Sequence, residues 1–162
     1  MMKNLFQILC GLFLVVSYSS CMHSEEDKVD VLIIGGGASG VTSGIQSARM
    51  GANTLILEES TWLGGMLTSA GVSAVDGNYR LPAGLWGEFK NRLSDYYGGL
   101  DSLKTGWVSN VLFEPSVGNK ILHEMVAAEN NLKVWKQACL EEVKRTGDEW
   151  VAKVKVEGQG VK

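Results

Sequence analysis

The chain contains little of what marks several large classes of protein. Its 162 residues include only two prolines and three cysteines, and no basic stripe with interleaved aromatic residues runs along it. The scarcity of proline argues against a low-complexity tract, and the net charge of -3 without a basic stripe argues against nucleic-acid binding. What is present is 45% apolar residues, 20% charged residues and 20 glycines, the composition of a globular α/β chain with several close backbone approaches.

The N-terminus carries a short apolar run. Lys3 precedes residues 5–16, which are apolar except for Gln7 and Gly11, and small polar residues follow. About twelve residues are too few to span a bilayer but are typical of the hydrophobic region of a signal peptide. We therefore predict that residues 1–20 are a signal peptide and that the protein is exported. A buried internal helix is the alternative, which the position at the extreme N-terminus disfavours.

Cys21 directly follows this segment. The stretch Ser19-Ser20-Cys21 resembles a bacterial lipoprotein cleavage site, where the cysteine is lipidated, although Tyr18 replaces the usual aliphatic residue. Residues 21–28 are rich in acidic side chains and resemble the tether of surface lipoproteins of the Bacteroides group. This predicts a membrane anchor through Cys21 at the outer membrane or cell surface. Ordinary signal cleavage, giving a periplasmic or secreted protein with a spare cysteine, stays open.

Cys139 is the cysteine left in the body of the chain. A single thiol cannot form an internal disulfide, and the cysteines have no metal-ligand spacing, so we predict no metal site. Because its neighbours are apolar and strand-like, Cys139 is predicted to be a small buried filler.

The most informative segment joins two apolar runs through a glycine-rich turn. Residues 29–34 read as a buried strand and lead directly into residues 35–40, which match G-x-G-x-x-G. A helical apolar pattern follows and ends at Gly51, and a second strand over residues 54–57 closes on Glu58. Strand, glycines, helix, strand and acidic tip in this order are typical of a dinucleotide-binding unit.

The glycines of this unit have separate mechanical roles. Gly35 permits the tight turn out of the strand, and Gly37 lets the backbone approach a pyrophosphate. The start of the helix, at Ala38 and Ser39, presents N–H groups and a partial positive charge to the phosphates. The predicted pyrophosphate-binding residues are Gly35, Gly37, Ala38, Ser39 and Gly40.

The rest of the unit concerns packing and the ribose. Gly40 and Gly44 allow the helix to pack closely on the sheet, and Glu58 can accept hydrogen bonds from the adenosine ribose. A tight turn in some other α/β protein is a weaker reading, since it leaves the ordered set of features unexplained. The unit by itself is used by both NAD and FAD enzymes.

The following segment favours FAD. Residues 62–68 resemble the loop of many flavoproteins in which a glycine pair runs under the cofactor, where a side chain would collide with it. Gly64, Gly65 and Met66 are therefore predicted to line FAD nearer its ring. An NAD-dependent dehydrogenase remains an alternative that leaves this glycine pair unexplained.

Residues 35–116 resemble the FAD-dependent oxidoreductase family, bacterial flavoproteins distantly related to the heterodisulfide reductase A subunit. The resemblance is carried by the glycine fingerprint, residues 63–68, Asp76-Gly77, and residues 84–89, 96–99 and 113–116. It implies a Rossmann-like FAD/NAD(P)-binding fold with a parallel sheet, FAD as cofactor and redox chemistry at the flavin. It names no catalytic acid or base, and the substrate, a small molecule or a glycan-related compound, stays undefined. Iron–sulfur clusters occur among the distant relatives, but no cysteine set in this sequence could hold one.

The remaining patterns predict further elements. Leu85 to Tyr96 has helical apolar spacing and ends at Gly98-Gly99, and Pro115 begins another helix in which His123 lies off the apolar face and is solvated. Residues 132–135 read as a third parallel strand, and residues 143–156 as an antiparallel hairpin. The buried face of the Pro115 helix is predicted to be Val117, Ile121, Leu122, Met125 and Val126.

Residues 29–162 are thus predicted to be the N-terminal part of an FAD-binding domain. The Ala-Thr-Gly-like turn and the Gly-Asp segment that the resemblance places later do not occur, so we expect a sheet with an open edge and exposed apolar surface. We expect this segment alone to be inactive. A surface-binding lipoprotein that kept the fold without redox chemistry is the other alternative.

Overall fold

Three parallel strands form the centre of the fold, which we describe from a computed structural model of residues 27–77, 79–158 and 160–162. Their order across the sheet is β1 (Val31–Ile34), β2 (Thr54–Glu58) and β3 (Leu132–Lys136). The central strand β2 is almost entirely buried, as expected for a parallel sheet covered on both faces. All three strands predicted from the sequence are present, but β1, which was predicted to be buried, is only partly buried because it lies at the edge of the sheet.

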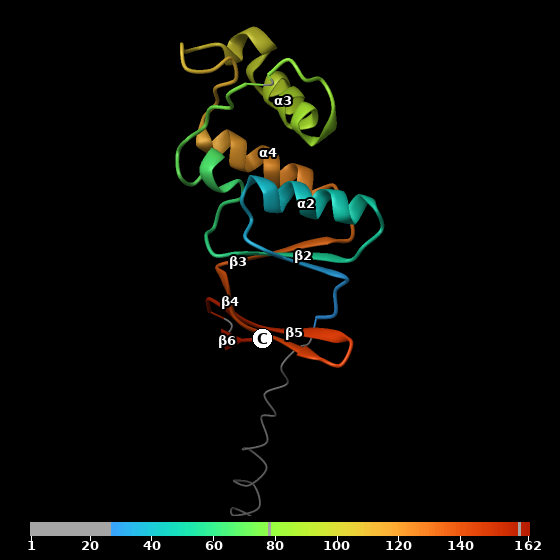
Figure 1. Cartoon of the computed structure of the whole chain (residues 1–162). Coiled ribbons are helices and arrows are strands. Elements are labelled where there is room, and N and C mark those ends of the chain that lie inside the picture. Colours follow the sequence, from blue (N-terminus) through green and yellow to red (C-terminus); the bar gives the residue numbers. More distant parts are fainter. Residues whose placement is uncertain (1–26, 78, 159) are drawn as a thin grey trace, which may run out of the picture.

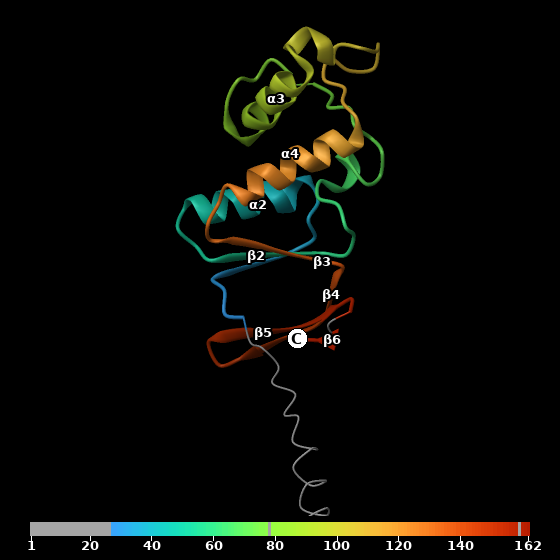
Figure 2. The ribbon, with the colours of Figure 1, turned by 180° about the vertical axis from the view of Figure 1, so that it is seen from behind.

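Two helices cover one face of this sheet. In Figures 1 and 2, α2 (Ala38–Arg49) and α4 (Pro115–Ala127) lie side by side along the sheet. α2 ends at Arg49 with Met50 as its C-cap, and Gly51 follows with a φ of 94°, a conformation that favours glycine. α4 begins at Pro115, whose missing N–H costs nothing in the first turn, and its five predicted core residues are all buried.

The opposite face of the sheet is covered by antiparallel strands. β4 (Ala138–Thr146) pairs with β5 (Glu149–Val156), which pairs with β6 (Gly160–Val161). Gln137, with a φ of 53°, redirects the chain from β3 into β4. The hairpin confirms the sequence prediction. A small core between the two sheets comprises Leu55, Leu57, Ala138, Val154 and Val156.

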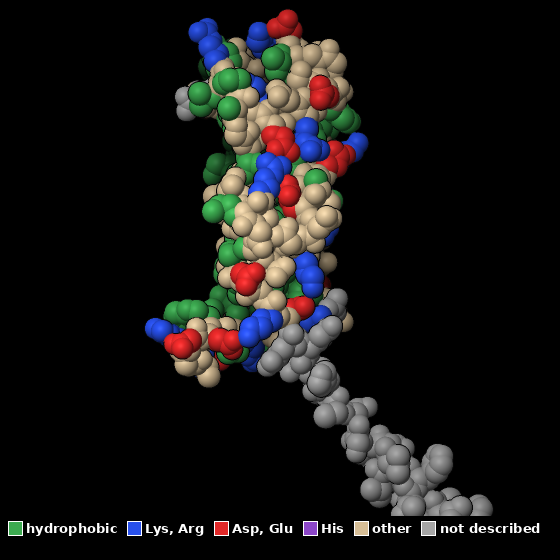
Figure 3. All heavy atoms as spheres, turned by 90° about the vertical axis from the view of Figure 1, so that its right-hand side faces the viewer, with side chains coloured by type: hydrophobic (Ala, Val, Ile, Leu, Met, Phe, Trp, Pro, Cys, Tyr) green, Lys and Arg blue, Asp and Glu red, His purple; other side chains and the backbone are tan. Residues whose placement is uncertain are grey.

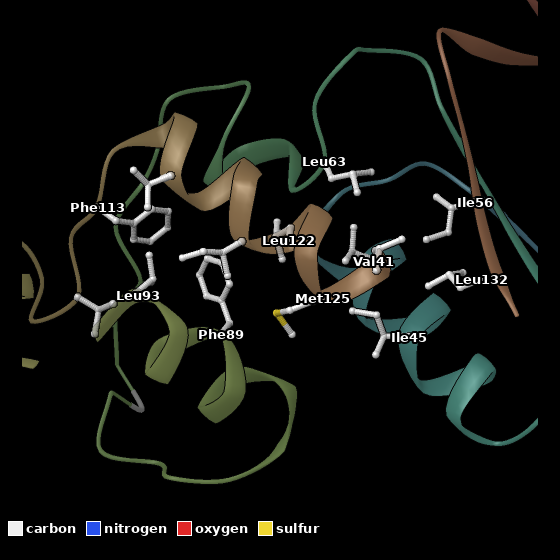
Figure 4. Close-up of a cluster of buried hydrophobic side chains, with 14 of the residues drawn as sticks. Val41, Ile45, Ile56, Leu63, Phe89, Leu93, Phe113, Leu122, Met125 and Leu132 are labelled. Atoms are coloured by element: carbon white, nitrogen blue, oxygen red, sulfur yellow. The ribbon is translucent and has the colours of Figure 1, made fainter. Parts of the chain in front are cut away.

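The third helix lies on the far side of α4 from the sheet (Figures 1 and 2). α3 (Gly84–Tyr97) ends at Gly98 in the left-handed conformation, as predicted, and a short 3-10 turn, η2 (Leu100–Leu103), packs against it. Phe89 and Phe113 meet edge to face with their ring centroids 5.5 Å apart. Figure 4 shows how this main core runs from Phe113 and Phe89 through Leu122 and Met125 to the α2 side chains.

Two side chains differ from their sequence predictions. Cys139 is exposed, so its assignment as a buried filler is wrong: successive strand residues face opposite sides, and Ala138 takes the buried position. His123 lies off the buried face of α4, as predicted, but is half-buried rather than fully solvated.

The surface has both an open sheet edge and exposed apolar groups, as expected from the sequence. Among the described residues β1 has a neighbour on one side only, and its Ile34 is 54% exposed. Figure 3 shows apolar side chains gathered beside the antiparallel sheet. The exposed large apolar residues of this sheet are Val143, Trp150, Val151 and Val161.

The predicted signal peptide, Cys21 and most of the tether lie within residues 1–26, outside the described residues. Within the part of the chain that the structure describes, no helix has the length and apolar character needed to cross a bilayer.

Candidate functional site

The glycine-rich loop between β1 and α2 is held in one conformation by close backbone contacts. Gly35 has a φ of 97° and donates its N–H to Leu57 O at 2.8 Å, which fixes the turn at the end of β1. A Cβ on Gly40 would stand 1.9 Å from Gly35 O, and one on Gly44 would stand 2.6 Å from Ile56. The predicted turn and packing roles of these glycines are therefore confirmed.

The N-terminus of α2 faces open space beside this loop. Its N-cap is Gly37, no described side chain caps it, and its first turn holds no acidic residue. The first N–H groups of a helix have no acceptor within the helix, and with the helix dipole they favour an anion. Apart from its neighbours in the chain, no described atom lies within 4 Å of the position that a Cβ would take on Gly37. Ala38 and Ser39 form the first turn at this end.

Glu58 is fixed at the end of β2 by two backbone donors. Its Oε2 accepts the N–H of Gly36 at 2.7 Å, and its Oε1 accepts the N–H of Ser60 at 2.8 Å. The carboxylate is half-buried and lies at the carboxyl edge of the sheet, where open α/β folds bind their ligands. Each carboxylate oxygen has a second lone pair, so the group keeps capacity to accept a ligand hydroxyl.

The second glycine segment lies directly against the first. Gly64 donates its N–H to Gly36 O at 2.8 Å, and a Cβ on Gly65 would stand 3.1 Å from Gly37 Cα. Gly64 and Gly65 both have positive φ, 104° and 54°, so this segment requires glycines. Met66, in the 3-10 turn η1 (Gly65–Leu67), is 68% exposed. The structure thus brings the predicted glycines and Glu58 together, and Met66 follows Gly65 with its side chain exposed beside them.

Helix α4 supports this second segment with a residue that the sequence analysis did not select. Asn119 Oδ1 accepts the N–H of Leu63 at 2.9 Å, 56 residues away along the chain. Leu122, one helical turn further on, lies so close that a Cβ on Gly64 would stand 2.6 Å from its Cδ1. Figure 4 shows Leu63 and Leu122 as members of the same core, which also includes Val41 of α2.

Two side chains outside the glycine segments, Cys139 and His123, have shifted pKa values. The hydrogen bond from the thiol of Cys139 to Glu59 Oε1, at 3.5 Å, raises the pKa of Cys139. Partial burial, with a smaller contribution from Lys136, lowers the pKa of His123. No cluster of three metal-ligating side chains occurs among the described residues.

The chain matches the FAD dependent oxidoreductase family over residues 30–162. It therefore belongs to this family, whose cofactor is FAD. No curated protein sequence matches the chain.

Several solved flavoprotein and hydroxylase structures share the fold. The flavoprotein/dehydrogenase from Cytophaga hutchinsonii is 16% identical with a TM-score of 0.59, and the match covers 84% of this chain and 36% of the dehydrogenase. The anhydrotetracycline hydroxylase OxyS from Streptomyces rimosus is 13% identical with a TM-score of 0.57, covering 84% and 30%. The aromatic hydroxylase CabE is 16% identical with a TM-score of 0.56, covering 84% and 29%. The chain therefore spans about a third of the length of each. At these identities the likeness shows the Rossmann-type fold alone.

The residues present fit the adenine dinucleotide part of FAD. The N-terminus of α2 has no capping side chain, so its free N–H groups could bind the pyrophosphate. The open space beside Gly37 would let the ligand lie directly against the backbone. Gly64 and Gly65 keep a second stretch of backbone bare beside that space.

Proposed function

We propose that this chain supplies the FAD-binding N-terminal part of an exported FAD-dependent oxidoreductase. One observation carries the proposal: the hydrogen bond from Gly64 N to Gly36 O joins the two glycine segments beside the N-terminus of α2. A turn that served packing alone would need Gly40 and Gly44, but it would not need a second bare glycine pair against the first.

Each residue of the site has a defined part in this proposal. Backbone N–H groups at the start of α2, from Gly37 to Gly40, bind the pyrophosphate, and Gly35 sets the turn that aims them. Glu58 accepts the ribose hydroxyls while its two backbone donors hold it in place. Gly64, Gly65 and Met66 line the cofactor beyond the pyrophosphate.

In this proposal the described residues bind and orient FAD, and none of them is assigned as a catalytic acid or base. Bound FAD supplies the transfer of electrons or a hydride. The bare backbone of Gly64 and Gly65 would let the cofactor lie against the protein without an intervening side chain. We propose a small molecule or a glycan-related compound as the substrate.

Thermal unfolding of the whole gene product with FAD and with NAD tests this proposal. A ligand that binds only the folded state raises Tm, by an amount that grows with its concentration over its Kd. We expect FAD to raise Tm and NAD to leave it unchanged. A rise with NAD instead would favour a dehydrogenase, and no rise with either would favour a binding lipoprotein without redox chemistry.

We also propose that Cys21 anchors the protein to the outer membrane or cell surface through a lipid. The support is the sequence Ser19-Ser20-Cys21 after a signal-like segment, followed by acidic residues. Labelling cells with an alkyne fatty acid should mark the wild-type protein and leave Cys21→Ser unmarked. Equal labelling of both, or none of either, would contradict the anchor and favour a periplasmic or secreted protein.

A further inference from the structure

A continuous series of hydrogen bonds runs from α4 to the acidic end of β2. Asn119 Oδ1 accepts from Leu63 N at 2.9 Å, and the next residue, Gly64, donates to Gly36 O at 2.8 Å. Gly36 in turn donates its own N–H to Glu58 at 2.7 Å. Each bond joins segments that are far apart in the sequence, so the relative placement of the two glycine segments depends on this series.

Asn119 holds the first bond of the series. Leu63 is fully buried, so its N–H has no access to water and needs a protein acceptor. Only the Oδ1 atom of an asparagine amide accepts a hydrogen bond, which fixes the orientation of the amide group.

Apolar side chains of α4 also pack against residues 63–68. A Cβ on Gly118 would stand 3.3 Å from the Cγ2 of Thr68, and Leu122 closes on Gly64. Thr68, which is 1% exposed, donates its hydroxyl to Leu63 O. Figure 4 shows Leu63 and Leu122 within one continuous core. These contacts keep residues 63–68 close to α4, but Asn119 alone among them holds a backbone N–H of the segment.

We infer that Asn119 is a positioning residue for FAD: it holds the Gly64-Gly65 segment at the distance from the glycine fingerprint that the cofactor requires. This inference rests on the proposed function. Asn119 acts through Leu63 and Gly64, because its amide oxygen is already used by the backbone of the loop.

The test compares three variants of the whole gene product. Asn119→Ala removes the acceptor, Asn119→Asp keeps an acceptor oxygen at the same place, and Asn91→Ala removes an exposed asparagine from α3 as the matched control. FAD affinity is measured by titration calorimetry, and the setting of the flavin by its visible circular dichroism. About 0.3 M KCl screens the new carboxylate of Asn119→Asp from the phosphates.

We expect Asn119→Ala to bind FAD about tenfold more weakly, the effect of one lost hydrogen bond to a buried N–H, with an altered visible spectrum. Asn119→Asp should retain the wild-type spectrum and an affinity within about threefold of wild type. Asn91→Ala should match wild type in both.

A purely structural role gives a different result. If Asn119→Ala lowered the Tm of the apoprotein but bound FAD with wild-type affinity and spectrum, the inference would be overturned. If Asn119→Ala did not fold, Asn119→Ser, whose hydroxyl is too short to reach Leu63 N, takes its place with the same expected weakening. Failure of wild type itself to bind FAD would overturn the proposed function, whereas normal binding in every variant overturns this inference alone.

Discussion

The carboxylate of Glu58 accepts the backbone N–H of Gly36 at 2.7 Å, so the acidic end of β2 and the glycine fingerprint hold each other in place. In the sequence pattern, Glu58 is a ligand for ribose. In the structure it also supports the glycine-rich loop between β1 and α2, which we propose binds the pyrophosphate. Loss of this side chain should therefore weaken the fold as well as the affinity for the cofactor.

Glu58→Ala leaves two backbone donors, those of Gly36 and Ser60, without their acceptor. Each hydrogen bond to a charged group contributes about 2 kcal/mol, so losing both should lower the free energy of unfolding of the apoprotein by about 2 to 4 kcal/mol. Glu58→Gln, which keeps one acceptor oxygen, should lose less. Urea denaturation without FAD measures both. Glu59→Ala, beside it and exposed, is the control, and equal stability of Glu58→Ala and Glu59→Ala would contradict the supporting role.

Gly40→Ala should prevent folding or lower the free energy of unfolding by at least about 3 kcal/mol. The added Cβ would stand 1.9 Å from Gly35 O, a backbone atom that cannot move without opening the turn. Gly37→Ala is the matched control, because its Cβ meets no described atom within 4 Å and its φ of -64° is ordinary for alanine. The effect is measured as the yield of soluble protein and its urea midpoint. A Gly40→Ala protein as stable as wild type would be inconsistent with this packing.

Cys139 should react slowly with Ellman's reagent at neutral pH although it is exposed. The hydrogen bond to Glu59 raises the pKa of the thiol, so less of the reactive thiolate is present. Glu59→Ala should lower that pKa and speed the reaction. Cys139→Ser serves as the blank for other thiols, and an unchanged rate in Glu59→Ala would show that Glu59 does not control this thiol.

His123 should make the protein less stable in mild acid. Because burial lowers its pKa in the folded state, the unfolded chain binds the proton more readily. The contribution of the neutral histidine is complete above its ordinary pKa and is lost as the pH falls through that value toward the folded one. Urea midpoints at about pH 7.5 and about pH 5.5 should differ less for His123→Gln than for wild type. The same difference in both proteins would exclude this role.

The local parts of the fold could be predicted from the sequence because each leaves a short-range signal. The β-branched run before Gly35, the apolar spacing from Val117 to Val126 and the glycines after Arg49 and Tyr97 mark strands, helices and helix ends. Ala138, Cys139 and Leu140 are all apolar, so their residue types alone do not show which of them face the core. The predicted burial of Cys139 is therefore wrong. Alternation set by packing of the two sheets decides which of them is inside.

The support of the site could not be predicted in the same way. The bond between Asn119 and Leu63 spans 56 residues, and a single polar residue in a helix carries no sign of its partner. The double use of Glu58 is also a tertiary property, because Gly36 approaches it only when β1 and β2 pair in register. The glycine segments could be predicted because a stretch of backbone without side chains requires glycine, and glycine is visible in the sequence.

The most direct test of the account is the FAD affinity of the whole gene product in its wild-type and Gly37→Ala forms. We expect wild type to bind one FAD per chain and Gly37→Ala to unfold at the same urea concentration yet bind FAD at least about tenfold more weakly, because its new methyl group occupies the free space beside the start of α2. Equal FAD affinity in the two proteins, or no FAD binding by either, would contradict a cofactor site at this loop.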